Sequence, residues 1–163
     1  MGAPRIEVVI VPETSKATLA NLMQLYLHDM AEFTDDPMDE NGLYDLSQYF
    51  SLYWQESERY PFFIMADGGI AGFALVREFE PGKFSMAEYF ITRRFRRSGI
   101  GKSAAHQLFE RFQGEWHVAE EEMNLPAQEF WCTIINEYTQ GQYQRTINDA
   151  HPKGPKQVFM SPN

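Results

Sequence analysis

Hydrophobic residues along the chain recur at two different spacings, and these spacings predict strands and helices. Short runs of apolar or β-branched residues are typical of strands, whereas apolar residues at every third or fourth position are typical of helices. The runs predict strands at 6–11, 62–66, 70–79, 83–91 and 116–118, and two weaker strands near 143–147 and 157–160. Helices are predicted over 19–33, 44–56, 100–112 and 127–138.

The order of these elements predicts the fold class. Asp67-Gly68-Gly69 is a tight hairpin signal and Pro81-Gly82 marks the next turn, so the three strands between 62 and 91 form a meander. The full order is β-α-α-β-β-β-α-β-α-β-β, and this mixture predicts an α+β fold or an α/β fold with a mixed sheet. With 163 residues, of which 44% are hydrophobic, we expect one domain over residues 1–163.

Composition and charge exclude several classes of protein. The formal charge of −9 argues against non-specific binding to nucleic acid. The apolar runs are too short to cross a bilayer, and the first residues lack a signal-peptide core. Cys132 is the only cysteine, so no disulfide forms within the chain and a cytoplasmic location is expected. The four histidines show no metal-ligand spacing, so we expect no metal.

Positive charge is concentrated in residues 93–102, which have the sequence RRFRRSGIGK. This segment holds five of the fourteen Lys and Arg residues, and no acidic residue lies between Glu88 and Glu110. It joins a predicted strand to a predicted helix. Gly99 and Gly101 allow the backbone to come close to a ligand, and the start of the helix presents free N–H groups to it. The segment therefore predicts an anion site, most simply for a phosphate-bearing ligand.

Other interpretations of the basic segment are a solvated surface or a contact with RNA. Gly101-Lys102-Ser103 also imitates the end of a P-loop. That motif needs a glycine where Arg96 stands, so nucleotide hydrolysis is disfavoured.

The residues Arg96-Arg97-Ser98-Gly99-Ile100-Gly101 resemble the Arg/Gln-x-x-Gly-x-Gly/Ala motif of the GNAT superfamily of CoA-dependent N-acetyltransferases. The neighbouring elements agree, because a second helix opened by Asn124-Leu125-Pro126-Ala127 follows a short strand. The resemblance covers nearly the whole order of elements and is sharpest over residues 86–135. It implies a twisted mixed sheet of about six or seven strands, flanked by about four helices. Acetyl-CoA would lie where strands four and five splay apart.

The resemblance also implies which residues hold acetyl-CoA. Backbone N–H groups of the motif would bind the pyrophosphate, and the edge of the fourth strand would pair with the pantetheine arm. The implied set is Phe90, Ile91, Thr92, Arg96, Arg97, Ser98, Gly99, Ile100, Gly101, Lys102, Asn124 and Trp131. Asn124 is equally suited to capping its helix, and both roles stay open.

In the reaction implied by the resemblance, an amine attacks the thioester directly. The N–H near Ile91 would polarise the carbonyl, and Glu88 would act as general base, although a structural pairing of Glu88 with a nearby arginine is the alternative. Many family members place a tyrosine as general acid where this chain has Phe130-Trp131. Tyr138, about two helical turns later, is the candidate substitute. Protonation of the thiolate by solvent is the other route.

The predicted function is therefore acetyl transfer from acetyl-CoA to a primary amine of a small molecule or peptide. The alternative is a catalytically silent acyl-CoA-binding sensor or interaction module. No motif names the acceptor, and a homodimer is left open. Two groups of residues could contact an acceptor, or could simply be surface and core. They are the acidic residues Asp35, Asp36, Asp39 and Glu40 and the aromatic residues Tyr26, Tyr44, Tyr49, Tyr53 and Trp54.

Overall fold

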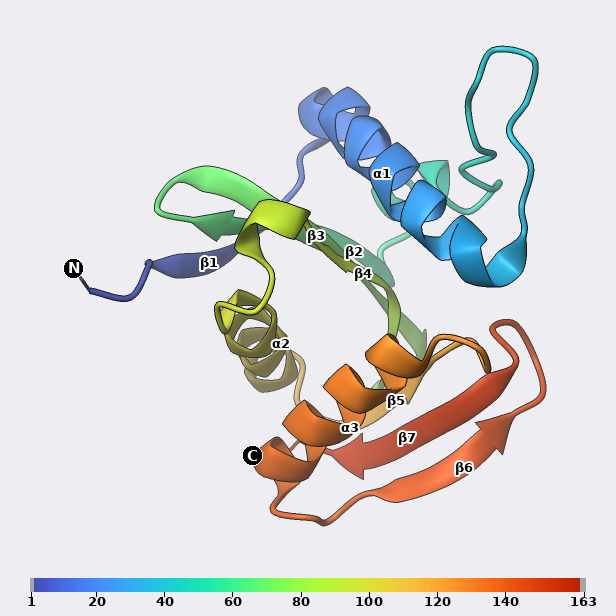
Figure 1. Ribbon diagram of the computed structural model, residues 1–163. Coiled ribbons are helices and arrows are strands. Elements are labelled where there is room, and N and C mark those ends of the chain that lie inside the picture. Colours follow the sequence, from blue (N-terminus) through green and yellow to red (C-terminus); the bar gives the residue numbers. More distant parts are fainter. Residues whose placement is uncertain (1, 162–163) are drawn as a thin grey trace.

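A seven-stranded sheet is the frame of the computed structural model, which describes residues 2–161 (Figure 1). The strand order is β1-β2-β3-β4-β5-β7-β6. β4 and β5 pair in parallel, and all other neighbours pair antiparallel. The strands are β1 (Ile6–Ile10), β2 (Arg59–Ala66), β3 (Gly69–Glu80), β4 (Lys83–Ile91), β5 (Glu115–Ala119), β6 (Gln144–Asn148) and β7 (Gly154–Met160). All seven predicted strands and the mixed fold class are thus confirmed.

Three α-helices are present among residues 2–161: α1 (Lys16–Thr34), α2 (Ile100–Arg111) and α3 (Leu125–Thr139). Short 3-10 helices occur at η1 (Glu13–Ser15), η2 (Ser51–Trp54) and η3 (Arg93–Phe95). None of the helices in this range combines the length and apolar character needed to cross a membrane.

The helix predicted over 44–56 is wrong, because only η2 forms there. Asp45 Oδ1 accepts a hydrogen bond from the Ser47 N–H, and Ser47 Oγ accepts one from the Tyr49 N–H. Such local side-chain bonds compete with the backbone bonds of a helix. Ser47 also has a φ of 74°, which lies outside the helical region. The aromatic side chains of the segment pack nonetheless, since Phe50 and Tyr53 are buried in the core beneath α1.

The sheet separates two hydrophobic cores. Alternate residues of β3 point to opposite faces, as the pleat requires. Phe73 and Leu75 belong to the core shared with α1, whereas Ala74 and Val76 belong to the core shared with α2 and α3. In Figure 1, α1 accordingly lies on one side of the sheet, with α2 and α3 on the other.

The pairing between β4 and β5 is short. Only three residue pairs are in register, Lys83 with Glu115, Phe84 with Trp116 and Ser85 with His117. β4 then continues to Ile91, where it pairs only with β3. The predicted splay between strands four and five is confirmed, and it leaves the last residues of β4 without a strand on that side.

A β-bulge lies where the splay begins. Val76 pairs with Met86 and Leu75 pairs with Glu88, so Ala87 is an extra residue in β4. One extra residue reverses the faces of all the side chains that follow it. Met86 accordingly packs in the α2–α3 core, whereas Phe90 packs in the α1 core. Because of the bulge, Glu88 faces α1 instead of being buried beside Met86.

Candidate active site

The basic segment forms a turn between the end of β4 and the start of α2. Arg97 and Gly99 have φ values of 60° and 82°, and Gly99 is the residue that caps α2. Within residues 2–161, the N–H groups of residues 97 to 102 donate no hydrogen bond to another part of the chain. Successive free N–H groups in such a turn form an anion-binding concavity, and the dipole of α2 adds to it.

The two glycines of the segment have different structural roles. A Cβ on Gly99 would meet no atom within 4 Å, but the positive φ there disfavours other residues. A Cβ on Gly101 would lie 3.0 Å from Cζ of Phe130. Gly101 therefore lets α2 pack closely against α3, which the motif did not indicate.

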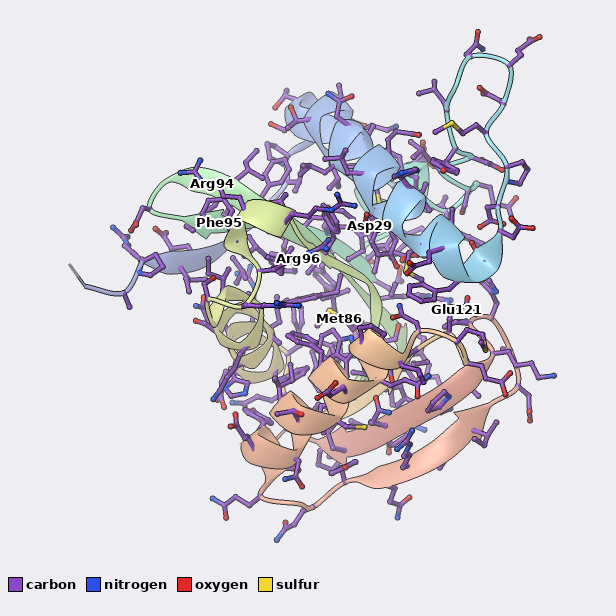
Figure 2. The ribbon with its side chains drawn as sticks, in the orientation of Figure 1. Asp29, Met86, Arg94, Phe95, Arg96 and Glu121 are labelled. Carbon is purple, nitrogen blue, oxygen red and sulfur yellow. The ribbon has the colours of Figure 1, made fainter. Side chains whose placement is uncertain are left out.

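The Arg96 side chain folds back onto the protein. Its Nε donates to the Ile91 carbonyl at 2.8 Å, and its Nη2 lies 2.6 Å from Oδ2 of Asp29 on α1. Nη2 of Arg93 lies 3.1 Å from the other oxygen of Asp29. Burial raises the pKa of Asp29, but the bonds from Arg96 and Arg93 outweigh burial and bring that pKa below its usual value. Figure 2 shows Asp29 and Arg96 between α1 and the segment after β4.

Glu88 lies on the α1 side of the sheet, next to the splay. The pKa of Glu88 is raised to about 7 in total. Burial is the main cause; the Tyr26 hydroxyl on α1 works against it, and the negative charge of Glu121 adds to it. Within the described residues Glu88 makes no ion pair, so its pairing with an arginine is not observed. A carboxylate with a pKa near neutrality can take up a proton at physiological pH.

Tyr138 lies on the other face of the sheet. Its hydroxyl donates to Oε1 of Glu110 at 2.8 Å, and its ring packs against His106 and Phe109. Burial and the Glu110 carboxylate both raise the pKa of Tyr138. The structure does not bring Tyr138 together with Glu88, and these contacts weigh against its predicted role as general acid.

The residues expected to hold the pantetheine arm are partly engaged already. The Ile91 carbonyl accepts the Arg96 bond, and the Thr92 N–H donates to the Ala71 carbonyl at 2.8 Å. Phe90 is buried with its ring against Tyr26. This leaves fewer groups for a pantetheine arm than the resemblance implies.

Asn124 and Trp131 both have structural contacts. Asn124 Oδ1 accepts from the Ala127 N–H at 3.1 Å and so caps α3, while Nδ2 faces the sulfur of Met30 on α1 at 3.7 Å. Trp131 is buried with its ring edge-on to Tyr89. The start of α3 thus meets the end of α1, and Trp131 is a core residue.

Two important residues were missed by sequence reasoning. A Cβ on Gly72 would lie 1.9 Å from the Phe90 carbonyl oxygen, so Gly72 permits the close approach of β3 to the end of β4. A glycine inside a strand is a known signal of such an approach. Asp29 carried no signal, because its partner Arg96 is 67 residues away in the sequence.

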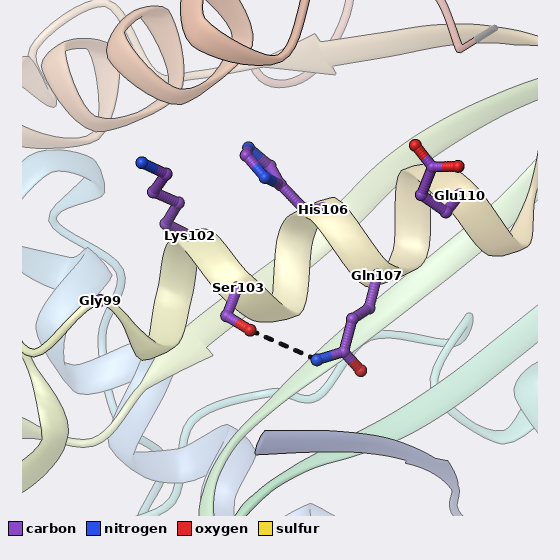
Figure 3. A pocket seen from close by; sticks show the side chains of 6 residues that line it. All are labelled: Gly99, Lys102, Ser103, His106, Gln107 and Glu110. Carbon is purple, nitrogen blue, oxygen red and sulfur yellow. Dashed lines mark hydrogen bonds between the residues drawn. The ribbon is translucent and has the colours of Figure 1, made fainter. Parts of the chain in front are cut away.

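A shallow depression of about 640 Å³ follows the outer side of α2 (Figure 3). It begins at Gly99, the last residue before α2, and continues along the helix. Its lining residues are Gly99, Lys102, Ser103, His106, Gln107 and Glu110. It is continuous with the free N–H groups but does not include Glu88. Among the described residues, no group of His, Cys, Asp and Glu is arranged to hold a metal ion.

Comparison with known proteins bears on the family and on the fold. A family model described as "Acetyltransferase (GNAT) family" matches residues 19–132. No curated protein matches the chain. Among solved structures, an acetyltransferase from Thermus thermophilus has a TM-score of 0.72 at 13% identity, covering 98% of this chain and 99% of that one.

Two further structures with this fold contain coenzyme A. The aminoglycoside acetyltransferase AAC(6')-Ib has a TM-score of 0.64 at 15% identity, covering 96% of this chain and 95% of its own. The PaiA N-acetyltransferase from Thermoplasma acidophilum has a TM-score of 0.61 at 12% identity, covering 96% of this chain and 99% of its own.

Proposed function

The chain belongs to the GNAT family of acetyltransferases, which depend on acetyl-CoA, and we propose that it transfers the acetyl group to a primary amine of a small molecule or peptide. One observation carries this proposal. The bulge in β4 places Glu88 beside the splay, and the same strand leads directly into the free N–H groups of residues 97 to 102. The proposed base and the proposed anion site therefore belong to one continuous segment, which supports the proposal.

The free N–H groups fit the pyrophosphate of acetyl-CoA. A diphosphate needs several converging donors, and no protein group among residues 2–161 occupies these. The space in front of Gly99 is open, which allows the phosphates to approach the backbone. The depression along α2 starts at the same glycine and would hold the adenosine end, with Lys102 and Gln107 at its wall.

Glu88 is suited to deprotonate the acceptor. An ammonium group must lose a proton before it can attack the thioester, and a carboxylate with a pKa of about 7 accepts that proton near neutral pH. The new C–N bond forms, the C–S bond breaks with the thiolate of CoA as the leaving group, and the nitrogen releases its second proton to solvent. Because Tyr138 is bonded to Glu110 on the far face, solvent protonates the thiolate in this mechanism.

The alternative function is a silent CoA-binding module. It is favoured by the absence of a tyrosine at Phe130-Trp131 and by the core position of Trp131. Thiol release from acetyl-CoA, measured across a panel of amines, separates the two functions. We expect turnover with at least one amine. Tight CoA binding without turnover on any amine would establish the silent module instead.

The CoA site has its own test, with a matched control. Gly99→Val is expected to raise the dissociation constant for CoA at least about tenfold, or about 1.4 kcal/mol, because the side chain blocks the phosphate approach. Gly68 in the β2–β3 turn has nearly the same φ, 81°, and also has nothing within 4 Å of a Cβ. Gly68→Val therefore introduces the same backbone strain away from the site. Equal CoA affinities in two folded variants would contradict the assignment.

A cytoplasmic location, a single domain over 1–163 and the lack of a nucleic-acid partner stay predictions. The acceptor itself is left to the amine panel.

A further inference from the structure

Asp29 closes a ring of contacts that joins α1 to the end of β4. We propose that Asp29 is a positioning residue. Through Arg96 it links the turn that binds CoA to the part of α1 that faces Glu88, so that the two segments open and close together. The inference rests on the proposed function, because it assumes that CoA binds at residues 97 to 102.

The ring has four members, joined by three side-chain contacts and closed by the backbone of α1. The Tyr26 ring meets the Phe90 ring edge-on, with centroids 6.0 Å apart. The Arg96 guanidinium lies over the same Phe90 ring at 5.5 Å, and its Nη2 lies 2.6 Å from Asp29. Asp29 and Tyr26 are three residues apart on α1, which places them on the same face of the helix. The helix itself thus closes the ring between Asp29 and Tyr26.

A single surface ion pair would not justify this proposal, since such pairs contribute about 0–1 kcal/mol. Three further contacts distinguish the Asp29 ion pair from an isolated pair. Each carboxylate oxygen of Asp29 has its own guanidinium partner, from Arg96 and Arg93. Arg96 is also fixed by its Nε bond to the Ile91 carbonyl and by stacking on Phe90. Asp29 itself is only 26% exposed. Networks of this kind are more persistent than isolated pairs.

The ring spans the two halves of the proposed site. Arg96 is the first residue of the turn that carries the free N–H groups, and Tyr26 faces Glu88 from α1. A CoA molecule that fixes the turn would therefore also fix the part of α1 above the proposed base. No direct contact between CoA and α1 is needed.

An alternative is that Asp29 acts only through its charge. In that case Asp29 weakens the positive field of the turn, and removing any nearby negative charge would strengthen CoA binding to a similar extent. Glu32 supplies the control for this effect. It is an exposed acidic residue one turn further along α1 and makes no ion pair in the described part of the chain. Glu32→Gln removes the same charge but leaves the ring intact.

Hydrogen exchange, read by mass spectrometry with CoA alone as the ligand, tests the coupling without a known acceptor. Each variant is measured at the same multiple of its own CoA dissociation constant. With CoA at about 100 times that constant, amide exchange slows by up to ~100-fold wherever it requires a local opening that releases CoA from the turn. In the wild type and in Glu32→Gln we expect CoA to slow amide exchange both in residues 93–103 and in the second half of α1. In the helix the exchange should slow by about tenfold or more. Peptides from β6 and β7 serve as the unaffected reference.

Asp29→Asn should keep the protection of residues 93–103 and lose that of α1. Arg96→Gln should lose only part of the α1 protection, because Arg93 still pairs with Asp29. The double variant should lose no more α1 protection than Asp29→Asn alone, because that change already removes the partner of both arginines. If CoA protects the turn in the wild type but leaves α1 unchanged, or if Asp29→Asn keeps the protection of α1, the coupling is overturned while the CoA site stands. If CoA binds but does not protect the turn, the proposed function fails first.

Discussion

The ends of β4 and β5 each carry a glutamate with a raised pKa, yet the two lie in different surroundings. Burial raises the pKa of Glu88 to about 7 and that of Glu120 to about 8. Glu88 faces α1 and the splay, with the Tyr26 hydroxyl as its neighbour. Glu120 faces β7, where Gln157 Nε2 donates to it at 3.0 Å. Both Glu120 and Gln157 are almost fully buried.

The difference shows that a perturbed pKa alone does not identify a catalytic base. Glu120 has the larger shift, but it has no route to a substrate. Its Oε2 and the Oε1 of Gln157 lack a hydrogen-bond partner among the described residues, which favours a neutral, protonated Glu120. Glu88 differs in being only half-buried, and the bulge at Ala87 turns its side chain towards α1.

The largest expected effect is on catalysis. Glu88→Gln should lower kcat/KM by about 100-fold or more, because the acceptor then loses its base. Glu120→Gln should change kcat/KM by less than about twofold. Initial rates of thiol release with the best amine of the panel measure both, and CoA affinity checks that both variants still bind. Equal losses in the two variants would remove the distinction between the two glutamates.

Much of this comparison could not be obtained from the sequence. The strands, α1, α2, α3 and the basic turn were predictable because each depends on residues that are neighbours in the chain, such as the alternating apolar residues of β3. Glu88 was predicted as the general base from its place on the strand that leads to the motif, and this role stays a prediction. The reason for its orientation was not, because a bulge depends on the register between β3 and β4.

The remaining parts of the site depend on contacts between distant segments. Asp29 lies 67 residues before Arg96, and Tyr26 is similarly far from Glu88 in the sequence. No spacing in the sequence links the members of either pair. The helix predicted over 44–56 failed for a different, local reason. Its aromatic residues indicated a buried face, but Asp45 and Ser47 accept hydrogen bonds from nearby backbone N–H groups, which competes with a helix.

The second prediction concerns stability against pH. A carboxyl group whose folded-state pKa is raised stabilises the protein below its unfolded pKa, and this stabilisation is lost as the pH rises through the folded value. For Glu120 the window runs from its ordinary value near 4.5 to about 8. Glu120→Gln removes this dependence, so the Tm of the variant relative to wild type should rise by about 3 °C or more between pH 5 and pH 9. Thermal unfolding across this range measures it. A constant difference would mean that Glu120 is not neutral in the folded protein.

The third prediction concerns the pH dependence of activity. Glu88 must be ionised to accept a proton, so kcat/KM should rise with pH through a midpoint near 7. The Tyr26 hydroxyl lowers the pKa of Glu88 by hydrogen bonding to the ionised form. Tyr26→Phe should therefore move the midpoint to higher pH. Tyr60→Phe is the control, because Tyr60 packs against Phe112 in the opposite core. A midpoint that moves equally in both variants would show that Glu88 does not set the profile.

The smallest expected effect comes from Glu121, in the loop between β5 and α3. Its charge raises the pKa of Glu88, but less than the Tyr26 hydroxyl lowers it. Glu121→Gln should therefore move the midpoint of the pH profile to lower pH, by less than Tyr26→Phe moves it upward. The neighbouring Glu122 is exposed to solvent, so Glu122→Gln is the matched control. Salt sharpens the result: added salt should shrink the Glu121 effect, which is carried by charge, and leave the Tyr26 effect, which is carried by a hydrogen bond. If Tyr26→Phe and Glu121→Gln move the midpoint in opposite directions and Glu120→Gln does not move it, the pH profile reports Glu88. If Glu120→Gln moves the midpoint, the profile reports Glu120 instead.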